Sequence, residues 1–131
     1  MKVLALDYGL ARTGVAVSDA TGTIARPLAV VEGAATAAGL RRLARIVSEE
    51  EVERVVVGLP LTLRGEPGLQ VEETARFVET LRGAVDVPVE SFDERFTTAL
   101  AAQGPSARAP EDARAAAHLL ESYLVWTAGC G

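Results

Sequence analysis

Short, uninterrupted apolar runs alternate with amphipathic stretches along this chain. The run at residues 3–6 ends at Asp7, and another run, residues 55–57, consists of three valines. Such runs are typical of strands that are buried on both faces of a sheet. Together with the turn residues between them, these patterns predict strands at residues 3–6, 14–17, 24–31, 52–59 and 87–92. Because Pro27 has no backbone N–H, we expect the third strand to lie at a sheet edge or to contain a bulge.

Apolar residues also recur at the helical spacing of three and four residues. This period predicts helices at residues 34–51, 69–82 and 111–127. The residues expected to face inward are Leu40, Leu43, Ala44 and Val47 in the first helix, Val71, Ala75, Val78 and Leu81 in the second, and Ala115, Ala116, Leu119, Leu120 and Tyr123 in the third. Three glutamates, residues 49–51, crowd the end of the first helix against its dipole, and we expect them to lie on a solvated face.

The predicted element order is β-β-β-α-β-α-β-α. Three strands followed by alternating helices and strands predict an α/β fold, with a mixed five-stranded sheet that is flanked by helices on both faces. A length of 131 residues is typical of a single domain, residues 1–131. The hydrophobic share of 49% and the charged share of 24% indicate a globular rather than a disordered chain.

Composition also bears on the setting in which the protein works. The single cysteine, Cys130, allows no internal disulfide, which suits a reducing cytosol. Asp7 stands where a signal peptide would need its apolar stretch, and no apolar run approaches the ~20 residues of a membrane span. We therefore expect a cytoplasmic protein without a membrane partner. The net charge of −5 by itself argues against a nucleic-acid binder, because such proteins usually carry a basic surface.

Four acidic residues stand at the ends of predicted elements. Asp7 follows the first strand, Asp93 and Glu94 follow the last strand, and Asp112 opens the final helix. If the first and last strands are close in the sheet, their carboxyl ends converge, and the spacing of Asp112 places it on the helix face that packs on the sheet. Clustered carboxylates repel one another unless a cation lies between them. One or two Mg²⁺ or Mn²⁺ ions relieve this repulsion and support phosphodiester cleavage. Taken singly, each acid is equally consistent with a turn or a helix cap.

Two arginines adjoin these acids: Arg12 in the first turn and Arg95 directly after Glu94. Each is suited to holding a phosphate and also to a surface ion pair with its acidic neighbour. Gly9 allows a close backbone approach in the first turn. Two divalent ions would add four positive charges at the acids, so the net charge does not exclude a nucleic-acid substrate. It predicts weak, metal-dependent and salt-sensitive binding.

Taken together, these residues resemble the YqgF/RuvX family. Its opening signature is similar to Asp7-Tyr8-Gly9, Arg12, Gly14 and Ser18-Asp19, its second motif to Gly58-Leu59-Pro60-Leu61, its third to Asp93-Glu94-Arg95 with Thr97, and its closing helix to Asp112 and Ala115-Ala116. The matches run in order over nearly the whole chain.

The resemblance implies an RNase H-like fold, similar to RuvC-type Holliday junction resolvases, and a nuclease that acts near the 5′ end of pre-16S rRNA. RNA is then the expected partner in preference to DNA, and the protein is expected to be a monomer or a homodimer. The residues that the resemblance implicates are Asp7, Asp112 and Glu94 or Asp93 as ligands of Mg²⁺ or Mn²⁺, and Gly9, Arg12, Arg95 and Thr97 as substrate contacts.

Other functions remain open on the sequence. The fourth strand ends in Val57-Gly58-Leu59-Pro60, without the carboxylate that RNase H-like nucleases commonly have there, which favours a nucleic-acid-binding domain that has lost its chemistry. Junction resolution would require a dimer that cuts two strands symmetrically. The Asp-x-Gly turn also resembles the phosphate loop of actin-like kinases, but two such domains around a nucleotide need more than 131 residues.

Overall fold

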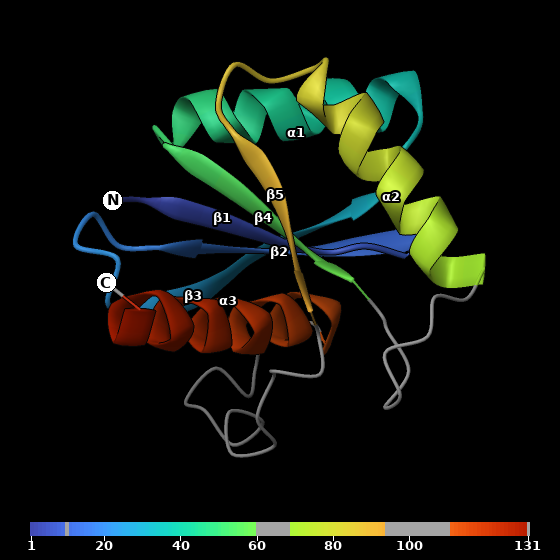
Figure 1. Ribbon diagram of the computed structural model, residues 1–131. Coiled ribbons are helices and arrows are strands. Elements are labelled where there is room, and N and C mark those ends of the chain that lie inside the picture. The colour runs from blue at the N-terminus through green and yellow to red at the C-terminus, as the bar shows by residue number, and fades with distance from the viewer. Residues whose placement is uncertain (10, 60–68, 94–110, 131) are drawn as a thin grey trace.

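The computed structural model of the protein describes residues 1–9, 11–59, 69–93 and 111–130 (Figure 1). The strands are β1 (Val3–Asp7), β2 (Arg12–Ser18), β3 (Ala25–Glu32), β4 (Arg54–Leu59) and β5 (Val89–Asp93), and the helices are α1 (Ala37–Glu49), α2 (Leu69–Arg82) and α3 (Glu111–Cys130). Their sequence confirms the predicted order β-β-β-α-β-α-β-α. None of the described helices has both the length and the apolar character of a membrane span.

The five strands form one mixed sheet in the order β3-β2-β1-β4-β5. β1 pairs antiparallel with β2, and β2 pairs antiparallel with β3. β1 pairs parallel with β4, and β4 pairs parallel with β5. The first three strands are therefore a meander, and the chain returns to the parallel half of the sheet through α1 and then through α2. This topology confirms the α/β fold with a mixed five-stranded sheet.

β3 is an edge strand, as expected from its proline. Val15 of β2 lies opposite Ala29, whereas the next residue, Ala16, lies opposite Pro27, so Leu28 is an extra residue in the ladder. This irregularity is a bulge, and an edge position leaves the missing N–H of Pro27 without consequence for the sheet. Both expectations drawn from Pro27 are confirmed.

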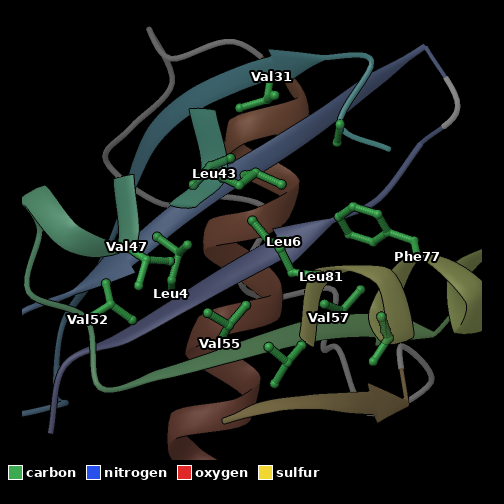
Figure 2. Close-up of a cluster of buried hydrophobic side chains, with 14 of the residues drawn as sticks. Leu4, Leu6, Val31, Leu43, Val47, Val52, Val55, Val57, Phe77 and Leu81 are labelled. Carbon is green, nitrogen blue, oxygen red and sulfur yellow. The ribbon is translucent and has the colours of Figure 1, made fainter. Parts of the chain in front are cut away.

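Two hydrophobic clusters lie on opposite faces of the sheet. In Figure 1, α1 and α2 lie above the sheet, and α3 lies below it, where it packs across β1, β2 and β3. The first cluster, shown in Figure 2, includes Leu4, Leu6, Val55, Val57, Leu43, Val47, Phe77 and Leu81. The second includes Val3, Ala5, Ala16, Val56, Phe92, Ala116, Leu119, Leu120, Tyr123 and Leu124. Along β1, odd-numbered residues therefore face α3 and even-numbered residues face α1 and α2.

α1 begins at Ala37, three residues later than predicted. Gly33 has a φ of +57°, a conformation that glycine adopts without strain, and it turns the chain out of β3. The Thr36 hydroxyl then caps the helix by accepting a hydrogen bond from the Gly39 N–H at 3.1 Å. Residues 34–36, which we predicted as the first turn of the helix, therefore precede it, and Thr36 is its N-cap.

Two of the three glutamates at the end of α1 are solvated, and the third is paired. Glu49 and Glu51 are exposed, as predicted. The Glu50 carboxylate lies 3.4 Å from both the Lys2 ammonium and the Arg26 guanidinium. For Glu50 the expectation of a purely solvated face is wrong, because this side chain joins the start of β1 to the start of β3.

The inward face of α2 is rotated relative to the prediction. Val78 and Leu81 are buried as expected, but Ala75 is exposed, and Thr74 and Phe77 are buried instead. The large Phe77 ring takes the inward position at the expense of the small Ala75, because it buries far more apolar area.

Candidate active site

The carboxyl ends of three parallel strands meet at one edge of the sheet. In the shared register, Leu6 of β1 lies beside Val57 of β4, and Leu59 at the end of β4 lies beside Asp93 at the end of β5. Asp7 is the last residue of β1. Two interstrand spacings of about 4.8 Å therefore place the backbones of Asp7 and Asp93 about 10 Å apart, with β4 between them. The ends of the first and last strands therefore lie at the same edge of the sheet, with one strand between them.

The start of α3 lies at the same end of the molecule. In Figure 1 the C-terminal end of α3 is near the N-terminus of the chain, and the helix begins on the side where the arrow of β4 ends. Asp112 is the second residue of α3 and lies one helical turn before Ala116, which is buried against the sheet. Asp7 has the same parity along β1 as Ala5, which packs against α3. Position 112 and Asp7 thus belong to the same face of the sheet.

The turn between β1 and β2 is closed by Thr13. Its side chain is fully buried; the Gly9 N–H donates to Oγ1 at 3.4 Å, and the hydroxyl donates to the Gly9 carbonyl at 3.5 Å. A Cβ at Gly9 would lie 2.5 Å from the Arg12 carbonyl oxygen, so the chain's own backbone requires glycine there. The Gly33 N–H donates to the Ala11 carbonyl at 3.1 Å and holds the turn from outside. This turn fixes the exposed Arg12 near the end of β1.

Tyr8 anchors the end of β1 on the face opposite to α3. Its ring is stacked on Phe77 of α2, with the ring centroids 4.3 Å apart and an interplanar angle of 14°. Burial, and next the negative charge of Glu73, raises the pKa of the Tyr8 hydroxyl. The hydroxyl therefore stays neutral at physiological pH, and the ring serves to hold the backbone that carries Asp7.

The structure places part of the predicted site. Asp7, Gly9 and Arg12 lie at the end of the molecule just described. Glu94, Arg95 and Thr97 lie outside the described residues, as do the side chains of Asp93 and Asp112. Among the side chains that the structure describes, no group of three acids, histidines or cysteines is arranged to hold a metal ion. Asp7 and the acids predicted beside it would supply oxygen ligands, and this donor chemistry fits Mg²⁺ or Mn²⁺.

Two side chains near this end were not singled out from the sequence. Thr13 is one. The sequence feature that could have indicated it is a hydroxyl residue at the start of an apolar strand, directly after a turn. The other is Arg114, whose buried Nε has no hydrogen-bond partner within the described part of the chain. The sequence feature that could have indicated Arg114 is its position in the first turns of a helix, where the helix dipole disfavours a positive charge. A buried, unsatisfied guanidinium nitrogen near Asp112 suits an anion such as a phosphate.

Comparison with solved structures defines the class of fold. The RuvC of Thermus thermophilus in complex with a Holliday junction substrate superposes with a TM-score of 0.64 at 20% identity, over 100% of this chain and 96% of that chain. The Fowlpox virus resolvase superposes with a TM-score of 0.58 at 12% identity, over 97% of this chain and 99% of that one. The fold is thus that of RuvC, which is RNase H-like, and the predicted fold class is confirmed.

Comparison of sequences identifies the family. The family described as "RuvX: Holliday junction resolvase" matches residues 1–125, and the chain belongs to this family. A relative from Chloroflexus aurantiacus is 44% identical over 93% of this chain and 85% of its own length. A relative from Rubrobacter xylanophilus is 45% identical over 94% of this chain and 91% of its own length. Both carry the name "Putative pre-16S rRNA nuclease". The resemblance drawn from the motifs is confirmed, and both descriptions are of nucleases.

Proposed function

We propose that this protein is a metal-dependent nuclease that cleaves phosphodiester bonds in RNA, in the cytoplasm, at the 5′ end of pre-16S rRNA. The observation that carries the proposal is that the ends of β1 and β5 lie at the same edge of the sheet, and that α3 begins on the side where β4 ends. Each of these three segments bears a predicted acidic ligand. The names of the relatives support RNA as the substrate.

In this proposal Asp7, Glu94 and Asp112 hold one or two Mg²⁺ or Mn²⁺ ions. The ions, when bound, supply an activated water and neutralise charge at the phosphate. The chain's own contribution is position: Tyr8 and Thr13 fix the backbone on either side of Asp7. Arg12 and Arg95 bind and orient the phosphate oxygens of the scissile group, with Gly9 and Thr97 beside them.

Strand alternation favours Glu94 over Asp93 as the ligand from the last strand. Glu90 and Phe92 of β5 both contact Tyr123 of α3, so even-numbered positions of β5 share the face to which Asp7 belongs. Asp93 is odd-numbered, and a strand that continued one residue further would give position 94 the parity of Phe92. We therefore expect Glu94→Gln to reduce cleavage far more than Asp93→Asn does.

The test is cleavage of labelled RNA that contains the 5′ end of 16S rRNA with its precursor extension, in Mg²⁺ or Mn²⁺. Asp7→Asn and Asp112→Asn are each expected to lower kcat by more than about 100-fold, since even the partners of metal ligands cost 10–100-fold when removed. Asp86→Asn is the matched control, because Asp86 is an exposed acid in the turn before β5, at the other end of that strand. Chelation with EDTA is expected to abolish cleavage by the parent protein. Cleavage by Asp7→Asn at the parental rate would refute the site.

Junction resolution is the second candidate, favoured by the family description and by the RuvC fold. It requires a homodimer that makes paired, symmetrical cuts in a four-way DNA junction. Sedimentation and a nicking assay on such a junction separate the two candidates: a monomer that cleaves the rRNA precursor without paired cuts supports the first. RNA binding without turnover in either metal would instead indicate a nucleic-acid-binding domain that lacks the chemistry.

A further inference from the structure

α3 carries an exposed aromatic residue about four helical turns after Asp112. Trp126 is 49% exposed and is the single tryptophan of the chain. An α-helix rises about 1.5 Å per residue, so the stretch from Asp112 to Trp126 spans about 21 Å. The indole therefore lies well away from Asp112.

Two buried rings hold the indole in place. The Trp126 ring lies 5.8 Å from Phe92 and 6.3 Å from Tyr123, measured between ring centroids. Phe92 and Tyr123 are buried and meet edge to face, at 5.5 Å and 89°. The inner side of the indole is thus fixed against β5 and α3, while about half of its surface faces solvent. A held aromatic surface loses little conformational freedom when a ligand binds to it.

Polar groups border this aromatic cluster. The Arg54 Nη1 donates to the Tyr123 hydroxyl at 3.2 Å and lies 3.5 Å from the Glu90 Oε1, and the Tyr123 hydroxyl donates to the same carboxylate. The side chains of Arg54 and Glu90 are 35% and 42% exposed, so both charges are fixed and yet reach solvent. An aromatic surface beside a guanidinium and a carboxylate offers partners for the ring, the phosphate and the N–H groups of a nucleotide.

We propose that Trp126 is a stacking platform for a base in a single-stranded segment of the nucleic-acid substrate, with Arg54 and Glu90 as its polar neighbours. The inference rests on the proposed nuclease function and adds a second contact site to it. With a net charge of −5 the chain cannot rely on general electrostatic attraction to nucleic acid. Stacking on an aromatic side chain supplies affinity that tolerates any sequence and depends less on salt.

The single tryptophan makes the test direct. Short single-stranded RNA is titrated into the full chain in EDTA, so that no cleavage occurs, while intrinsic tryptophan fluorescence and the anisotropy of a labelled RNA are recorded. We expect saturable quenching with the same Kd by both signals. A blunt duplex of the same sequence is expected to quench less, because its bases are already stacked. RNA binding without any change in tryptophan fluorescence would overturn the inference.

Variants then separate stacking from general packing. Trp126→Ala is expected to raise the Kd for single-stranded RNA by about 5- to 150-fold, and Trp126→Phe by less, since it keeps a ring. Val125→Ala is the matched control, because Val125 is 74% exposed on the same helical turn and belongs to no ring cluster; its Kd is expected to equal that of the parent. Thermal unfolding confirms that each variant is folded. In cleavage, Trp126→Ala is expected to raise KM and leave kcat unchanged.

The outcomes distinguish this inference from the proposed function. Cleavage of RNA by a folded Trp126→Ala variant with the parental KM would refute the stacking platform and leave the nuclease intact. A change in sedimentation of Trp126→Ala from dimer to monomer, with unchanged RNA affinity, would also refute it and assign the exposed ring to contact with a second copy. Absence of RNA binding by the parent protein both in EDTA and in Mg²⁺ would refute both.

Discussion

Replacing Gly39 by alanine is expected to destabilise the protein, although alanine is the better helix former. Gly39 lies in the first turn of α1, where alanine gains about 1 kcal/mol over glycine from helix propensity alone. A Cβ there would lie 2.1 Å from the Gly33 carbonyl oxygen and 2.7 Å from the Ala34 Cα, both backbone atoms that no rotamer change can move away. Overpacking of this kind costs about 1–3 kcal/mol, and displacement of the Thr36 cap costs about 1 kcal/mol more. The net expectation is a loss of about 1–3 kcal/mol in the free energy of unfolding.

Urea denaturation of Gly39→Ala beside Gly83→Ala tests this reasoning. Among the described residues, a Cβ at Gly83 would contact only the Thr80 carbonyl oxygen, at an ordinary 3.5 Å, so this control is expected to be neutral or stabilised by up to about 1 kcal/mol. The two variants share one chemical change and differ in the space available to it. If Gly39→Ala were as stable as Gly83→Ala, the close approach of α1 to the Gly33 backbone would be refuted.

The hydroxyl of Thr21 and two backbone N–H groups donate to the Asp19 carboxylate and lower its pKa to about 2. The stability that this group contributes is present above its unfolded pKa of about 3.9 and is lost as the pH falls through about 2. The Asp19→Asn variant is therefore expected to lose less thermal stability than the parent as the pH falls through this range. A pH profile of thermal stability identical to that of the parent would contradict this expectation. Burial raises the pKa of both tyrosines of the chain, Tyr8 and Tyr123. Ultraviolet titration is expected to show them less than half ionised at pH 10, and a midpoint at 10 would argue against their burial. Leu120→Ala, which empties a fully buried position of α3, is expected to cost about 2–5 kcal/mol in urea denaturation, and a loss below about 1 kcal/mol would contradict its place in the core.

The elements could be predicted where local residues alone determine them. Residues 3–6 had to be apolar on both sides because helices cover both faces of β1, and the sequence shows this directly. Pro27 limited β3 to an edge or a bulge by its missing N–H, and the structure has both. The inward face of α2 was predicted only in part: Val78 and Leu81 are buried, whereas the burial of Phe77 depends on Tyr8, a partner from another part of the chain.

The candidate site could be predicted only on the condition that the first and last strands lie close together in the sheet. Asp7 directly follows an apolar run, so its place at a strand end could be inferred from the sequence. Whether the ends of the first and last strands converge depends on the register of β4 between them, which pairs residues about fifty positions apart in β1 and about thirty-five apart in β5. The buried hydroxyl of Thr13 and the close contact at Gly39 likewise depend on tertiary structure.

The position of α3 determines the order in which the fold can be completed during synthesis. This helix covers one face of β1, β2 and β3, strands that leave the ribosome before it, yet its buried residues extend to Leu124. At about 5–20 residues per second, the ribosome needs about 5–18 seconds to add the residues between the end of β3 and Leu124. During that interval Val3, Ala5 and Ala16 have no helix to cover them. The nascent chain therefore presents an apolar sheet face that a chaperone can bind, and the final helix closes that face when it emerges.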